Sequence, residues 1–139
     1  MNLVLQVLAT AQAMEKAGQK IFRPHGLTVA QFNVLNLLAG QTDGLRASEL
    51  AKTLIVDPSN ITGLLNRMNG AGYLKQIQNP KDGRQRIVAL SAKGQRLWEQ
   101  THSEYQQRLK AFEAKIAEHD RRVTKKVLVW MVNESVAMP

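Results

Sequence analysis

The side chains that could do chemistry in this chain are cations and small hydrogen-bonding groups. Three cations, Lys81, Arg84 and Arg86, crowd the stretch NPKDGRQRIVAL, residues 79–90, whose Asn, Pro, Asp and Gly residues are typical of a turn. A turn needs polar residues, but it does not need this much positive charge. The stretch is therefore either a loop whose charges contact only solvent or a cationic tip that contacts a polyanion.

A second polar set follows Pro58, on one face of a predicted helix. It consists of Ser59, Asn60, Thr62, Gly63, Asn66, Arg67 and Asn69. Asn, Thr, Ser and Gly are poorer helix formers than the Glu, Lys, Gln and Ala that keep an ordinary helix soluble. We therefore interpret this face as one selected for hydrogen bonding to something that it reaches.

The titratable groups show no arrangement that would support catalysis. His25, His102 and His119 have neither metal-ligand spacing nor a paired nucleophile, and the carboxylates form no inward pair. We interpret the three histidines as surface or loop residues. The absence of cysteine excludes disulfides, thiolate metal sites and cysteine redox sensing. The sequence thus predicts no enzyme activity, no metal site and no cofactor.

The positive charge is concentrated in the middle of the chain. The 139 residues fit one domain and carry a net charge of +8, and residues 45–96 hold nine basic and three acidic residues. Such an excess is expected of a polyanion-binding module, although a solubilising surface would show it too. A secretory signal begins with basic residues, but no Lys or Arg precedes Lys16. No uncharged apolar run approaches the roughly 20 residues of a membrane span. We therefore expect a cytoplasmic protein that does not enter a membrane.

Helical spacing and capping signals predict the elements that hold these residues. Apolar residues at helical spacing predict a helix over residues 3–22, which the segment FRPHGL ends. Thr28 and Gln31 have the Thr-x-x-Gln form of a capping box, so a second helix runs from there to about residue 40.

The next two helices begin with signals of different strength. ASELAKTL, residues 47–54, predicts a short helix whose N-cap is either Arg46, a poor capping residue, or Ser48. Asp57 as N-cap and Pro58 at the first helical position strongly predict a further helix over residues 58–70. Apolar residues recur on its inner face at i, i+3, i+4 and i+7, namely Ile61, Leu64, Leu65 and Met68.

The remaining elements are a β-hairpin and two helices. YLKQIQ and RIVAL flank the loop at residues 79–84 and predict the two strands of the hairpin. Ser91 is the expected N-cap of a long helix with a heptad-like apolar stripe of Trp98, Tyr105, Leu109, Phe112 and Ile116.

A last helix, from near Asp120, contains VLVWMV at residues 127–132, which is apolar on every side. Such a helix must be buried all round, either in a core within the chain or against a second copy. Because the first helix is also largely apolar, the pattern favours a C2 homodimer, the commonest closed assembly.

Two short helices followed by a hairpin, all in the basic middle third, predict a helix-turn-helix with a wing. In that motif the second helix enters the major groove of DNA, where Asn can pair with adenine and the Thr methyl can touch that of thymine. Asn66, Arg67 and Asn69, further along, suit phosphate or structural contacts. The predicted contacts are Pro58, Ser59, Asn60, Thr62, Gly63, Asn66 and Arg67 on the helix and Lys81, Asp82, Gly83, Arg84 and Arg86 on the wing.

Three segments, LTVAQFNVLNLL, ASELAKTLIVDPSNITGLLNRMNGAGYL and NPKDGRQRIVALSAKG, resemble the MarR family of bacterial winged helix-turn-helix regulators in their order and spacing. The resemblance covers about residues 26–96. It implies one mainly α protomer with a small β-hairpin over residues 1–139. Residues 28–96 would form the winged-helix DNA-binding lobe, and residues 1–24 and 97–139 the dimerisation helices.

The resemblance also implies roles for single residues. Arg84 would enter a minor groove, whose negative potential attracts arginine where A·T pairs narrow it. Asp57, Arg67 and Asp82 fall at the spacing of an ionic cluster that fastens the wing in some members, although three unrelated surface charges would look the same. A small, often phenolic, effector would release the DNA, but this sequence gives no residue signature for its pocket.

The sequence therefore predicts a homodimeric regulator that binds an inverted repeat in double-stranded DNA, as a ligand-responsive repressor. The alternative is a winged-helix module that binds nucleic acid nonspecifically or mediates protein interactions. An RNA-binding module would usually expose aromatic side chains for stacking, and the few aromatic residues here are mostly at core spacing.

Overall fold

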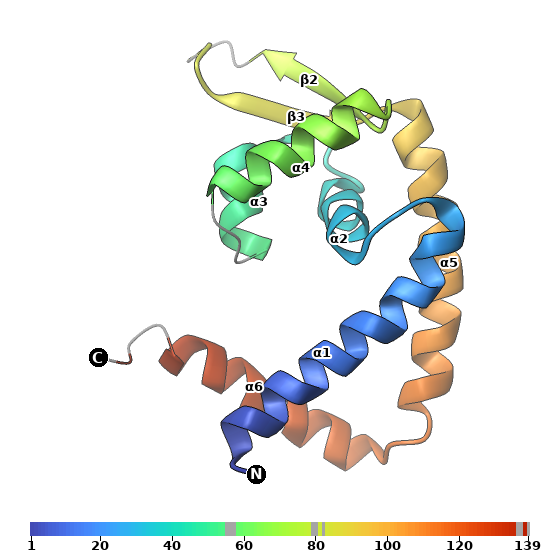
Figure 1. Ribbon diagram of the computed structural model, residues 1–139, viewed down its shortest axis with the longest axis vertical. Helices are drawn as coiled ribbons and strands as arrows, with labels where there is room; N and C mark the ends of the chain where they lie inside the picture. Colours follow the sequence, from blue (N-terminus) through green and yellow to red (C-terminus); the bar gives the residue numbers. More distant parts are fainter. Residues whose placement is uncertain (55–57, 79–80, 82, 136–137, 139) are drawn as a thin grey trace. The chain divides into compact units, whose positions relative to one another are not determined.

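The computed structural model describes residues 1–54, 58–78, 81, 83–135 and 138, which form two compact units, Met1–Glu104 and Tyr105–Pro139. The first unit contains, in chain order, α1 (Leu3–Phe22), the short 3-10 helix η1 (Arg23–His25), α2 (Val29–Leu38), β1 (Leu45–Arg46), α3 (Ala47–Leu54), α4 (Pro58–Gly70), β2 (Leu74–Gln78), β3 (Arg86–Leu90) and the first part of α5 (Ala92–Glu113). The second unit contains the rest of α5 and α6 (Glu118–Ser135) (Figure 1). The fold is mainly helical with a small antiparallel sheet, as predicted.

Local capping starts α2 as the sequence predicts. The Thr28 hydroxyl accepts a hydrogen bond from the Gln31 amide at 3.1 Å, and the Gln31 side-chain oxygen accepts one from the Thr28 amide at 3.0 Å. Gly26 before it has a φ of 73°, a left-handed conformation that favours glycine. The predicted capping box is therefore confirmed.

The start of α3 differs from one of the two expectations. The helix begins at Ala47, so Ser48 lies in its first turn and does not cap it. Instead, the Glu49 carboxylate accepts from the Arg46 amide at 3.2 Å and from Arg46 Nε at 2.7 Å. These bonds hold the pKa of Glu49 below its ordinary value. The ionised Glu49 carboxylate therefore stabilises the folded chain slightly at neutral pH, because solvent screens most of its interaction with Arg46. This stabilisation is lost as the pH falls through the lowered pKa.

The hydrophobic core of the first unit is built from α2, α3, α4 and the sheet. The rings of Phe22 and Phe32 stack with centroids 4.1 Å apart. The predicted inner faces of α2 and α4 are both buried, namely Phe32, Leu35 and Leu38 on α2 and Ile61, Leu64, Leu65 and Met68 on α4. α4 packs against α3 and β2, so its apolar face is buried in this core.

The hairpin is one part of a three-stranded antiparallel sheet with the order β1-β3-β2. In the predicted hairpin, Leu74 lies opposite Leu90 and Gln78 opposite Arg86. Sequence analysis missed β1, where Leu45 lies opposite Val88. Two residues are too short to show the alternation that identifies a strand.

The N-terminus of α5 is fastened to the turn that follows α4. The Ser91 hydroxyl accepts from the Gly94 amide at 3.0 Å, which confirms the predicted N-cap, and it donates to the Gly72 carbonyl at 2.6 Å. Lys93 Nζ donates to the Ala71 carbonyl at 2.9 Å. A Cβ added at Gly94 would collide with the Tyr73 carbonyl oxygen. Only glycine therefore fits this joint without displacing the backbone.

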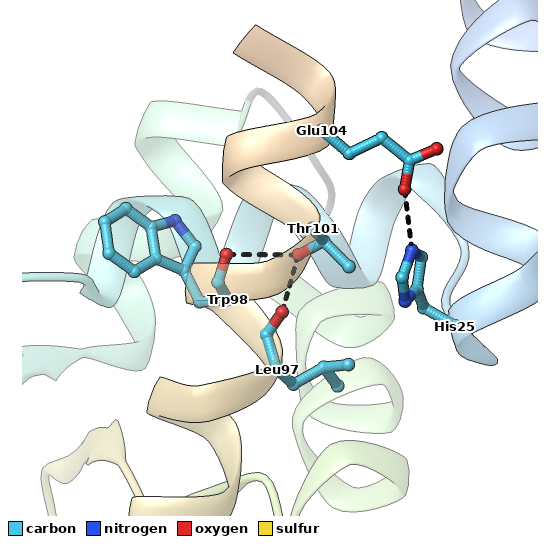
Figure 2. A network of polar contacts seen from close by, with 5 residues as sticks. All are labelled: His25, Leu97, Trp98, Thr101 and Glu104. Atoms are coloured by element: carbon cyan, nitrogen blue, oxygen red, sulfur yellow. Dashed lines mark hydrogen bonds and ion pairs between the residues drawn. The ribbon is translucent and has the colours of Figure 1, made fainter. Parts of the chain in front are cut away.

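Side chains of α5 also join it to the segment between α1 and α2 and to α2 itself. His25 Nε2 lies 2.9 Å from Glu104 Oε2 (Figure 2), and Trp98 Nε1 donates to Asn36 Oδ1 at 3.1 Å. His102 stacks on Trp98 with ring centroids 4.6 Å apart. His25 lies in the segment that connects α1 and α2, as interpreted, whereas His102 is half-buried on α5, so its interpretation as a surface residue is wrong.

The second unit leaves its apolar residues uncovered. Within the described residues, α6 has no buried side chain, and Trp130 is 61% exposed. Within the second unit, therefore, no core covers the segment VLVWMV. α5 ends at Glu113, so the predicted stripe is one residue too long, with Ile116 beyond the helix. No helix in the described ranges combines the length and the apolar character needed to cross a membrane.

The joint at Gly94 gives a stability prediction. Gly94→Ala should lower the free energy of unfolding by about 1 to 3 kcal/mol, because its Cβ must displace the Tyr73 backbone. Gly70→Ala is the matched control, since no atom lies within 4 Å of its Cβ and it should change stability by less than about 1 kcal/mol. Urea unfolding at one protein concentration measures both. Equal stability of the two variants would contradict the tight joint.

Candidate nucleic-acid interface

The outer face of α4 is the first part of the candidate site. Because Ile61, Leu64, Leu65 and Met68 are buried, the helical period turns the intervening residues outward. Most of the predicted contacts are accordingly exposed, namely Ser59, Asn60, Thr62, Asn66 and Arg67, and Gly63 is half-buried. Pro58 is the first residue of the helix, and its side chain lies outside the described part of the structure.

The tip of the hairpin is the second part. Lys81, Gly83 and Arg84 are exposed. Asp57 and Asp82 lie outside the described residues, so the expected capping by Asp57 and the expected cluster with Arg67 stay predictions. The loop before β3 also includes Gln85, one residue more than the predicted loop.

The hairpin runs back alongside α4, with its tip toward the end at which α4 begins (Figure 1). A side-chain contact joins the two elements: Arg86 Nη1 donates to Asn66 Oδ1 at 2.8 Å. Both residues were predicted as DNA contacts, but their contact with each other was not predicted, because a separation of 20 residues leaves no local signal. Arg86 is half-buried, unlike the exposed Arg84.

The chemistry of this surface is that of hydrogen bonding to a polyanion. At about 1.5 Å per residue, the 13 residues of α4 make a rod of about 20 Å, and a major groove about 12 Å wide admits such a helix. The amides and hydroxyls of α4 can donate and accept hydrogen bonds, and the cations of the hairpin tip can contact phosphates or a groove. Among the described residues, no three His, Asp or Glu side chains gather as metal ligands would.

One hollow of the first unit lies apart from this surface. It has a volume of about 350 Å³ and lies between the end of α2, the sheet and the start of α5. Leu38, Ala89 and Leu90 form its apolar wall, and Gln41, Lys75 and Gln95 its polar one. It contains none of the predicted contact residues, so we do not include it in the candidate interface.

Helices α2 to α4 followed by a β-hairpin in a three-stranded sheet define a winged helix-turn-helix protein. The model of the MarR family matches residues 25–85. The transcriptional activatory protein BadR of Rhodopseudomonas palustris is 31% identical over 100 residues, which cover 70% of this chain and 57% of BadR. The regulator TtmR of Methylorubrum extorquens is 32% identical over 96 residues, which cover 69% of this chain and 49% of TtmR. The chain belongs to the MarR family, as its three sequence segments predicted.

A solved structure agrees with this fold. In its crystallised DNA complex, MepR of S. aureus superimposes with a TM-score of 0.88 at 19% identity, covering 96% of this chain and 98% of MepR. The chain spans about half the length of the curated relatives BadR and TtmR.

Proposed function

We propose that this chain is a sequence-specific regulator that binds double-stranded DNA, with α4 in the major groove and the tip of the hairpin at an adjacent minor groove. The observation that carries the proposal is the exposed row of amides and hydroxyls on α4, directed outward by its buried inner face and placed beside a cationic hairpin. Family membership supports the same assignment, since BadR and TtmR bear the names of transcriptional regulators.

Within this proposal, the predicted residues take four kinds of role. Ser59, Asn60 and Thr62, near the start of α4, read base edges. Pro58 and Gly63 keep the helix backbone close to the DNA. Basic residues contact phosphates and set the affinity. Phosphate contacts carry no sequence information by themselves. Lys81, Asp82, Gly83 and Arg84 form the wing, in which Arg84 enters the minor groove.

The proposal includes a homodimer. Large apolar side chains of α1 are exposed within the first unit, and those of α6 within the second: Leu3, Val4, Leu5, Leu8 and Met14, and Val123, Val127, Leu128, Val129, Trp130 and Val132. Monomeric proteins rarely expose contiguous apolar patches of more than a few hundred Å². A second copy of the chain would cover both helices. A twofold dimer then fits an inverted repeat whose half-sites lie about one helical turn apart.

The sign of regulation depends on where the bound site lies. A repressor that a small, phenolic effector releases follows from the family resemblance. BadR bears the name of an activator, so the position of the site relative to a promoter decides the sign of regulation. The runner-up function, nonspecific binding of nucleic acid or contact with a protein, would leave α4 without a preferred duplex.

Asn60 distinguishes these two functions. Asn60→Ala should weaken binding to the preferred duplex by about tenfold or more, since a base-reading pair contributes roughly 1 to 3 kcal/mol of discrimination. Binding to random DNA should not change. Asn33→Ala, the same substitution at an exposed position of α2, is the control and should alter neither affinity. Fluorescence anisotropy with both duplexes measures the two affinities. An equal loss on both duplexes would remove Asn60 from base reading.

Arg84 tests the wing. Arg84→Ala should lower the affinity and reduce the slope of log K against log salt by about 0.9 for each phosphate charge that Arg84 neutralises. Lys115→Ala removes an equal charge from the exposed segment between α5 and α6 and should leave the slope unchanged. Titrations at four or more salt concentrations give the slopes. The same slope for Arg84→Ala as for the unmodified protein would contradict the wing assignment.

A further inference from the structure

The contact between Arg86 and Asn66 gives one of the predicted DNA-binding arginines a different role. Arg86 is the first residue of β3 and Asn66 lies in the middle of α4. The hydrogen bond from Arg86 Nη1 to Asn66 Oδ1 measures 2.8 Å, which is short for a bond between nitrogen and oxygen, as is usual when the donor is charged. It therefore fastens the wing to the middle of α4, beyond the candidate base-reading residues near the start of the helix.

A third side chain completes the arrangement. Gln78 lies opposite Arg86 and Gln76 opposite Val88, so Gln76 and Arg86 are diagonal neighbours on one face of the hairpin. With its carboxamide oxygen turned toward the guanidinium, Gln76 accepts from Arg86 Nε at 3.3 Å and from Nη2 at 3.2 Å. All three nitrogens of the guanidinium then donate within the protein. The planar fork of arginine allows this, and the single ammonium of lysine does not.

Exposure separates Arg86 from the other wing cations. Lys81 and Arg84 are exposed, whereas Arg86 is half-buried between the hairpin and α4. Three of the five N–H donors of Arg86 bond to Asn66 and Gln76, which leaves only two for a phosphate. The charge of Arg86 therefore serves the geometry of the protein.

We propose that Arg86 is a positioning residue that clamps the Asn66 carboxamide of α4 and the Gln76 carboxamide of the hairpin, and that it sets the register between helix and wing on DNA. This inference rests on the proposed function and deepens it. An oriented Asn66 amide presents its NH₂ group as a fixed donor toward the DNA, because its oxygen already accepts from Arg86. Without Arg86, Asn66 and the hairpin would each have to be ordered on binding.

The test combines a readout in the free protein with binding measurements. In the protein without DNA, Arg86→Ala should shift the side-chain NH₂ resonances of Asn66 in a ¹⁵N-correlated NMR spectrum, and Arg84→Ala, the matched control, should not. Unchanged Asn66 resonances in Arg86→Ala would overturn the contact. This measurement needs no DNA, so it stands even if no preferred duplex exists.

The binding arm uses Arg86→Ala, Arg86→Lys, Asn66→Ala and the double variant. Arg86→Ala should weaken binding to the preferred duplex about fivefold, the equivalent of one hydrogen bond of about 1 kcal/mol, with the salt slope unchanged. The double variant should bind no more weakly than Asn66→Ala, because Arg86 acts through Asn66. Arg86→Lys should bind the preferred duplex as weakly as Arg86→Ala, because the contact requires the planar guanidinium and not only a positive charge.

Three results would overturn the positioning role: full rescue by lysine, additive losses in the double variant, or a salt slope that falls by about 0.9, as expected of a phosphate contact. An unmodified protein that prefers no duplex would contradict the proposed function instead. The NMR measurement would still decide whether Arg86 holds Asn66.

Discussion

The direction in which α4 faces is the constraint on which the candidate interface depends. Ile61, Leu64, Leu65 and Met68 are buried against α3 and the sheet. Burying one such side chain contributes about 1.5 to 3 kcal/mol, whereas an exposed Asn, Thr or Ser costs less than about 0.7 kcal/mol in helix propensity. Burial therefore decides the rotation of the helix, and the outer face is free to carry poor helix formers. A polar set selected for contacts can exist there because four apolar residues stabilise the helix from the other side.

Contacts from α5 and from the hairpin support this helix within the first unit. α5 is joined to the end of α4 through Ser91, Lys93 and the close approach at Gly94, and it is joined to η1 by the ion pair of His25 with Glu104. The hairpin is joined to α4 by Arg86. In the first unit, the candidate contact surface is thus held at both the end and the middle of α4. A surface with such supports is suited to a ligand of regular geometry, as a DNA duplex is.

Sequence analysis predicted what is local in the chain. The capping box of α2, the inner face of α4, the two strands of the hairpin and the Ser91 cap follow from spacing within a few residues, and all are confirmed. The failures are short or distant features. β1 has only two residues and depends on pairing with β3, and His25 meets Glu104 across 79 positions. The contact of Arg86 with Asn66 was not predicted for the same reason, because only the fold brings the two residues within reach of each other.

The central claim is that two copies of this chain place two outward faces of α4 on one symmetric DNA site. Selection of duplexes from a random library, followed by hydroxyl-radical footprinting and mass measurement of the complex, tests it most directly. A dimer on a symmetric site should enrich an inverted repeat with half-site centres about 10 base pairs apart, protect it symmetrically about its centre, and bind as two chains per duplex. Enrichment of no sequence, or one chain bound to an asymmetric site, would contradict it.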